Sequence, residues 1–151
     1  MAFFDRLQSE TAQARAHVTG APVIEAIREG RFDLTGYTWF LTQAYHHVKH
    51  TVPLMMACGG RLPERLEFVR KALVEYIEEE YGHHEWILND LEACGEDKEA
   101  IRHGSPDTSI ELMVAYLYDR INRGNPAAFF GMVQVLEGTS IELATPLGEA
   151  I

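Results

Sequence analysis

The fold is decided by residues 63–94, which read PERLEFVRKALVEYIEEEYGHHEWILNDLEAC. At about 100° per residue, the apolar side chains of this stretch fall on one stripe, as is typical of an amphipathic helix. Pro63 precedes the pattern and Gly95 follows it, and these residue types mark helix starts and ends. We therefore predict one long helix over residues 64–94. Its stripe contains Leu66, Val69, Leu73, Tyr76, Ile77, Ile87 and Leu91.

The rest of the chain shows helical periodicity too, with no alternation of apolar and polar residues that would indicate paired strands. We expect an all-α fold. Pro53 should kink the helix in which it lies, and Gly59-Gly60 should end that helix. An acidic loop should follow Gly95, and Thr145-Pro146 should begin one more helix. The other predicted helices span residues 3–18, 23–29, 34–58, 109–122 and 126–144.

Length, charge and cysteine content narrow the class of protein. A chain of 151 residues suits a single domain over residues 1–151, and 46% apolar residues can fill its core. A net charge of −10 disfavours nucleic acid and anionic membrane surfaces as partners. No run of about 18 apolar residues predicts a membrane span. Two cysteines provide neither a disulfide framework nor a zinc site, so we expect a cytoplasmic protein.

A carboxylate and two imidazoles lie close together on the long predicted helix. Glu80 is the last of three consecutive glutamates and the one that falls on the apolar stripe, and His83 and His84 follow on the same face. A carboxylate that faces an apolar core is costly unless it is paired, protonated or bound to metal. Carboxylate and imidazole together suit first-row metals, and Glu-x-x-His is a repeating unit of di-iron bundles. Alternatively, Glu80 lies at a bundle end or pairs with Arg70 or Arg120.

A second carboxylate, Glu137, falls inside the apolar face of the predicted helix over residues 126–144. Three small residues follow it and permit close packing. Two core-facing glutamates on separate helices, one of them beside histidine, favour a metal site over solvation at the surface. The alternative is a lone buried acid held by hydrogen bonds. The candidate metal ligands are therefore Glu80, His83 and Glu137, with His84 as the alternative to His83.

Three further histidines, His46, His47 and His50, lie off the apolar stripe of the predicted helix over residues 34–58. Their position predicts a polar flank with partial burial. Alternatively, His46 or His47 lines a substrate cavity or acts as an axial haem ligand. The candidate cavity-lining residues are Tyr45, His47, Met55, Phe129 and Phe130.

Other catalytic chemistries lack their markers in this sequence. It contains no Gly-x-Gly-x-x-Gly, Walker A, Gly-x-Ser-x-Gly or His-Glu-x-x-His motif. Cys58 and Cys94 lie near predicted helix ends, where the helix dipole disfavours a thiolate nucleophile.

Three stretches resemble successive segments of the haem-oxygenase-like superfamily. They read FLTQAYHHVKHTVPLMMACGGRLP, EEEYGHHEWILNDLEACGED and FFGMVQVLEGTSIELATPLGEAI. The sequence is most similar to the branch of iron-containing redox enzymes, the haem-oxygenase-like di-iron oxidases. The resemblance implies an up-down helical bundle, two iron ions that activate dioxygen, and a small or fatty organic substrate. It places Glu80, His83 and Glu137 at the branch's first three ligand positions.

Members of that branch also use a His, an Asp and a second His from a later helix. This sequence has no histidine after His103, so a second iron requires a further helix. We expect the parent protein to continue past Ile151 with such a helix, in His-x-x-x-Asp-x-x-His spacing.

The leading hypothesis is an iron-dependent oxidoreductase that uses a small-molecule substrate and dioxygen and can form a homodimer. Three alternatives stay open: a haem-binding protein, a thiaminase-like protein related to TenA and PqqC, and a non-catalytic helical scaffold.

Overall fold

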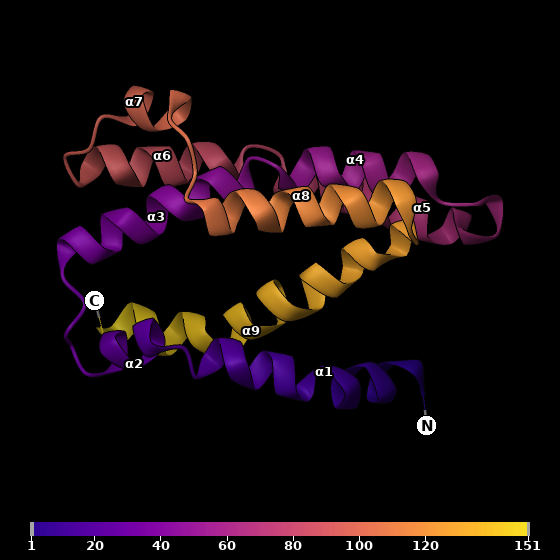
Figure 1. Cartoon of the computed structure of the whole chain (residues 1–151), viewed down its shortest axis with the longest axis horizontal. Coiled ribbons are helices and arrows are strands. Elements are labelled where there is room, and N and C mark those ends of the chain that lie inside the picture. Colours follow the sequence, from indigo (N-terminus) through magenta and orange to yellow (C-terminus); the bar gives the residue numbers. More distant parts are fainter. Residues whose placement is uncertain (1, 151) are drawn as a thin grey trace. The chain divides into compact units, whose positions relative to one another are not determined.

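The computed structural model describes the backbone of residues 2–150 and the side chains of residues 2–140. Every regular element in this part of the chain is helical, which confirms the all-α prediction. The helices are α1 Phe3–Thr19, α2 Pro22–Arg28, α3 Leu34–Val48, α4 Thr51–Arg61, α5 Glu67–Glu80, α6 His83–Ala93, α7 Lys98–His103, α8 Thr108–Arg123 and α9 Phe129–Ala150, with 3-10 turns η1 Glu64–Leu66 and η2 Pro126–Ala128 (Figure 1).

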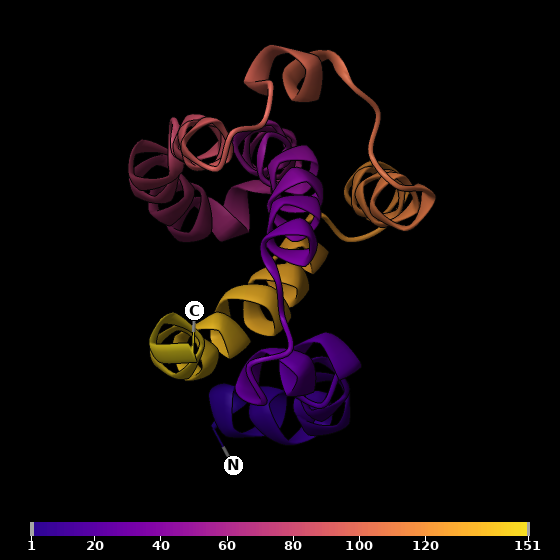
Figure 2. The same cartoon turned by 90° about the vertical axis from the view of Figure 1, so that its left-hand side faces the viewer.

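The helices group into two compact units. Residues 34–129 form one unit, and the residues up to Asp33 together with those from Phe130 form the other. In the first unit α3 packs on α6 and α8, whereas α4 packs on α5, α8 and η2. The short helix α7 packs on α6 at the edge of this unit, as Figures 1 and 2 both show.

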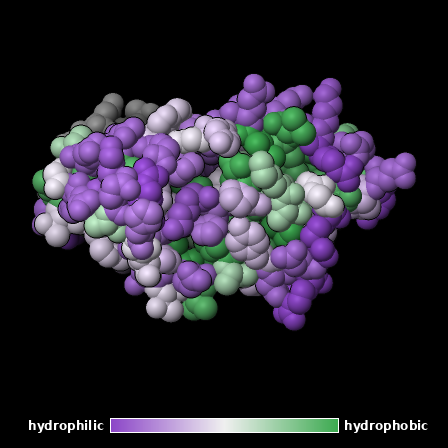
Figure 3. All heavy atoms as spheres, turned by 90° about the horizontal axis from the view of Figure 1, so that it is seen from above, coloured by the Kyte–Doolittle hydropathy of each residue, from purple (hydrophilic) through white to green (hydrophobic). Residues whose placement is uncertain are grey.

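The core of residues 34–129 is made by apolar side chains from α3, α4, α5, α6 and α8, and by Phe129 at the start of α9. The most completely buried of these are Leu54, Met55, Leu73, Leu88, Leu91, Ile121 and Phe129. On the face that Figure 3 shows, hydrophilic side chains dominate, and apolar ones gather in one part of it. In the other unit Ile27 of α2 and Thr139 of α9 are buried.

The long helix predicted over residues 64–94 is wrong, because the chain breaks between α5 and α6. Gly82 has φ +97°, in the left-handed region that glycine enters without a steric penalty. The break changes the phase of the apolar stripe in α6. Leu88 is fully buried in place of the predicted Ile87, which is half-buried.

The helix predicted over residues 34–58 is also two helices, α3 and α4, which meet at Lys49 and His50. Pro53 explains the break, because its ring would clash with the carbonyl of residue 49 in a continuous helix. It lies in the first turn of α4, where its missing N–H costs nothing. Helix α4 continues past Cys58, and the Gly59 carbonyl accepts a hydrogen bond from Arg70 Nε at 2.9 Å.

Two further expectations are corrected. The predicted acidic loop contains α7, whose N-terminus is capped by Asp97 accepting from the N–H groups of Glu99 and Ala100. Its six residues are too few to show periodicity. No new helix starts at Thr145-Pro146, since α9 continues to Ala150.

Candidate metal centre

The two closest candidate ligands lie on opposite sides of the break between α5 and α6. Glu80 is the last residue of α5 and His83 is the first residue of α6, with Tyr81 and Gly82 between them. The left-handed turn at Gly82 keeps the two side chains together, and His83 Nδ1 lies 3.0 Å from Glu80 Oε2. The predicted carboxylate–imidazole pair therefore forms, although not on one continuous helix.

Burial distinguishes Glu80 from the other glutamates of its run. Its side chain is 19% exposed and that of His83 is 30% exposed, whereas Glu78 and Glu79 are exposed. This confirms that one of the three carboxylates faces inward. A half-buried carboxylate next to imidazole is a favourable place for a cation, because neither group is fully hydrated by water.

Trp86 covers one side of this pair. Its ring lies against the His83 imidazole, with the ring centroids 4.2 Å apart and an interplanar angle of 36°. Trp86 itself is 62% exposed. Trp86 therefore shields one face of the His83 ring from water and limits the rotation of that ring.

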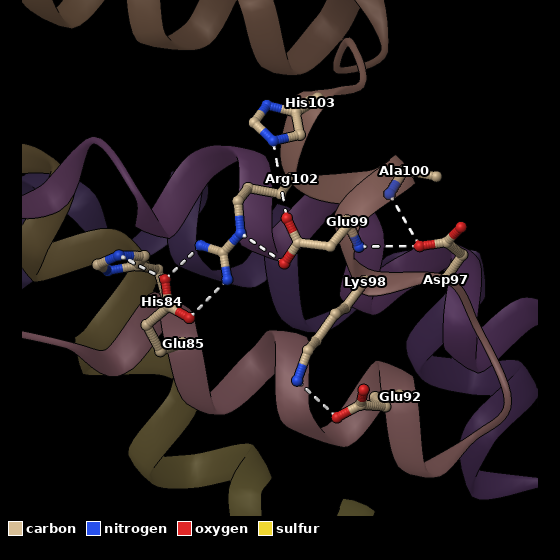
Figure 4. Close-up of polar contacts among 9 residues, drawn as sticks. All are labelled: His84, Glu85, Glu92, Asp97, Lys98, Glu99, Ala100, Arg102 and His103. Atoms are coloured by element: carbon tan, nitrogen blue, oxygen red, sulfur yellow. Dashed lines mark hydrogen bonds and ion pairs between the residues drawn. The ribbon is translucent and has the colours of Figure 1, made fainter.

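The alternative ligand, His84, faces another partner. Its Nε2 lies 3.4 Å from Glu85 Oε1, and its ring is 6.5 Å from the ring of Tyr45. Glu85 is in turn bound by Arg102 of α7, as Figure 4 shows. These contacts favour His83 over His84 as the partner of Glu80. Nothing in the local sequence distinguishes Arg102 from an ordinary surface arginine, and the sequence analysis did not identify it.

The arginine alternative for Glu80 is wrong. Arg70 pairs with Glu67 and donates to the carbonyls of Gly59 and Leu62. Arg120 pairs with the adjacent Asp119. Both guanidinium groups are thus engaged elsewhere, and the contact of Glu80 is with His83.

The third candidate ligand, Glu137, lies on α9 in the other unit and is half-buried. One turn further along α9, Ser140 Oγ donates to the backbone carbonyl of Glu137 at 2.8 Å. Among the side chains of residues 2–140, no three His, Cys, Asp or Glu groups gather closely enough to hold a metal ion. The convergence of Glu137 with Glu80 and His83 remains a prediction.

The candidate cavity residues are mostly enclosed. Tyr45 is 3% exposed, and Met55 and Phe129 are fully buried within residues 34–129. Phe130 is half-buried and belongs to the other unit. His47 is half-buried, and its Nε2 atom is buried without a hydrogen-bond partner. Their role in lining a cavity remains a prediction.

His46 corrects the prediction of a partly buried polar flank, because it is only 2% exposed. Helix α3 is covered by both α6 and α8, so its buried surface is wider than a single apolar stripe. His46 Nδ1 lies 3.1 Å from Lys49 Nζ. Burial, with a smaller contribution from Lys49, lowers the pKa of His46.

The Cys58 thiol is inert in the folded protein. It is fully buried in α4 and donates to the Pro126 carbonyl at 3.2 Å. Burial raises the pKa of the Cys58 thiol to about 11, so it stays protonated near neutral pH. This confirms its poor placement as a nucleophile.

We expect a thiol reagent at pH 8 to titrate at most one cysteine quickly in the folded protein, namely half-buried Cys94. Cys58 should react only when the chain unfolds, because the thiolate is the reactive form. An absorbance assay on the native and urea-unfolded protein measures this, with Cys94→Ser as the control. Two thiols reacting at once in the native protein would contradict the burial of Cys58.

Comparison with known proteins identifies the family to which this site belongs. Residues 38–151 match the family described as iron-containing redox enzymes. The chain belongs to this family. This stretch includes Glu80, His83 and Glu137. Iron is therefore the cofactor of the family, and a carboxylate oxygen with an imidazole nitrogen is a donor set that suits it.

A solved structure shows the same fold. It is a domain of unknown function with a haem oxygenase-like fold from Shewanella denitrificans OS217, with a TM-score of 0.83 and 24% sequence identity. The match covers 100% of this chain and 65% of that chain. A search of curated proteins finds no match. Within the described part of the chain, no helix is long and apolar enough to cross a membrane.

Proposed function

We propose that this protein is an iron-dependent oxidase or oxygenase that uses dioxygen on a small or fatty organic substrate. Glu80, His83 and Glu137 would hold the iron. The observation that carries the proposal is the half-buried Glu80–His83 pair, with its 3.0 Å contact, in a member of the iron-containing redox enzymes. Ferrous iron, when bound, supplies the electrons that activate dioxygen.

Each side chain of the proposed site has a separate task. The negative charge of Glu80 favours a cation and holds the His83 ring through its Nδ1 atom. Trp86 excludes water from one face of that ring. The proposed substrate lies against apolar side chains, where a dry cavity favours an organic molecule over water. The apolar side chains are those of Tyr45, Met55, Phe129 and Phe130, and His47 is the polar one among the proposed lining residues.

The proposal assigns ligands for one iron. A second iron needs donors beyond Glu80, His83 and Glu137, and the His, Asp and His of a further helix would supply them.

Iron binding by matched glutamate variants tests the proposal. Protein is loaded with ferrous iron without oxygen and desalted, and iron per chain is measured for the wild type, Glu80→Ala, Glu137→Ala and Glu79→Ala. We expect Glu80→Ala and Glu137→Ala each to weaken iron binding by at least about tenfold, because each removes a ligand. Glu79→Ala should bind as the wild type does, since it removes the same charge from an exposed position.

Two outcomes would defeat the assignment. One is equal iron in all four proteins, which would place the metal elsewhere. The other is equal loss in Glu79→Ala and Glu80→Ala, which would indicate a general effect of negative charge. Circular dichroism of each variant checks that the helices are retained.

A further inference from the structure

Helix α7 is attached along α6 by two ion pairs, one near each end of α6. Arg102 binds Glu85 in the first turn of α6, and Lys98 Nζ lies 2.6 Å from Glu92 Oε2 in its last turn (Figure 4). Ile101 of α7 packs against the buried cluster that contains Tyr45 and Leu88. The two ion pairs therefore join the same two helices but at opposite ends.

The Arg102 pair is the more constrained of the two. Its guanidinium contacts both Glu85 oxygens, at 2.5 and 2.9 Å, and Arg102 Nε donates to Glu99 at 3.1 Å. A planar two-point contact fixes orientation as well as distance, whereas the Lys98 ammonium is a point charge. The guanidinium also lies beside the buried Tyr45, where it opposes part of the rise that burial causes in the pKa of that phenol.

The first turn of α6 needs such support because its local connection to α5 is permissive. Gly82 has a left-handed conformation, and a Cβ built there would have no atom within 4 Å. The bond from Glu85 N–H to the Gly82 carbonyl, at 2.9 Å, lies within the first turn of α6 and does not join α6 to α5. A glycine in open space does not hold the direction of the following helix, so tertiary contacts must do so.

We propose that Arg102 is a positioning residue for the metal centre. Through Glu85, two residues after His83, it fixes the first turn of α6 and thereby holds the His83 imidazole against Glu80. The consequence for metal binding rests on the proposed function. The contact of His83 with Glu80 does not depend on the proposed function, because it is part of the structure itself.

The experiment compares Arg102→Gln with Lys98→Gln, which cuts the other ion pair between the same helices. Affinity for ferrous iron is measured by anaerobic titration, and the ring nitrogens of His83 are observed by ¹⁵N NMR in the metal-free protein. We expect Arg102→Gln to weaken iron binding about tenfold or more, because it removes a group that orients a metal ligand through Glu85. Lys98→Gln should stay within about twofold of the wild type.

The NMR readout separates this inference from the proposed function. In the metal-free protein, Arg102→Gln should shift the His83 ring signals toward those of Glu80→Ala, and Lys98→Gln should not. If the wild-type protein binds no iron and Arg102→Gln still causes this shift, the proposed function is defeated and the positioning role is supported. Equal effects of Arg102→Gln and Lys98→Gln in both measurements would overturn the inference, because they would indicate only docking of α7.

Discussion

Replacing Leu88 with alanine is expected to lower the free energy of unfolding by about 3 to 5 kcal/mol. Leu88 is fully buried on α6 in a cluster with Tyr45 and Leu91. Ile101 of α7 packs against the same cluster, so the shortened side chain leaves a cavity between helices that the fold cannot easily fill. Urea denaturation followed by circular dichroism gives the change in free energy.

Two matched variants show whether this loss of stability is caused by the burial of Leu88. Leu112→Ala makes the same chemical change on α8 at a site that is 63% exposed, and it should cost less than about 0.5 kcal/mol. Ile87→Ala should fall between the two, because Ile87 is half-buried. A larger loss for Ile87→Ala than for Leu88→Ala would mean that the apolar stripe continues from α5 without a change of phase.

Acid is expected to destabilise the protein as the pH falls below about 6.5, the ordinary pKa of histidine. Burial lowers the pKa of His46, His47 and His50 in the folded protein. Lys49 adds to this effect at His46 and His50, and Glu111 opposes it at His50. Between the ordinary and the lowered pKa, the unfolded chain binds more protons than the folded chain.

The neutral forms of these three histidines therefore contribute their full stability above the pKa of histidine in the unfolded chain. This contribution is lost as the pH falls toward their lowered pKa values in the folded chain. Each histidine contributes a slope of at most about 1.4 kcal/mol per pH unit, and the three together at most about 4 kcal/mol per pH unit. Urea denaturation at closely spaced pH values measures the slope. The range from about pH 7 to about pH 5 is suitable, because histidine titrates there.

His46→Gln should reduce this slope, since His46 is the most buried of the three. His103→Gln is the control, because it makes the same replacement at a side chain that is 77% exposed. A slope that is the same in the wild type and His46→Gln would contradict this, because it would mean that His46 binds protons equally in the folded and the unfolded chain.

Local patterns in the sequence were sufficient for much of the fold. Helices α1, α2 and α8 begin and end within one or two residues of their predicted bounds. Their periodicity and flanking residues act within a turn or two, so no distant part of the chain is needed to specify them. The inward position of Glu80 and its contact with His83 also follow from short spacing, which a break of two residues at Tyr81 and Gly82 does not abolish.

Other features required the packing of distant segments. His46 is buried because α6 and α8 cover α3 on a wider surface than its own periodicity indicates. Local propensity gives no measure of how many neighbours cover a helix, and that number decides whether a polar flank meets water or protein.

The sequence by itself determined that the chain is all-helical and that the Glu80 carboxylate and the His83 imidazole lie side by side. Only the tertiary structure decided that the helix predicted over residues 64–94 breaks at Gly82, and which groups hold α6. Arg102 and Glu85 are 17 residues apart, and Gly82 adopts its left-handed turn where the packing of α3 on α6 and of α4 on α5 requires a change of direction. The physical reason is that short-range periodicity fixes each helix, whereas the energy of burying its side chains depends on partners that the chain brings from elsewhere.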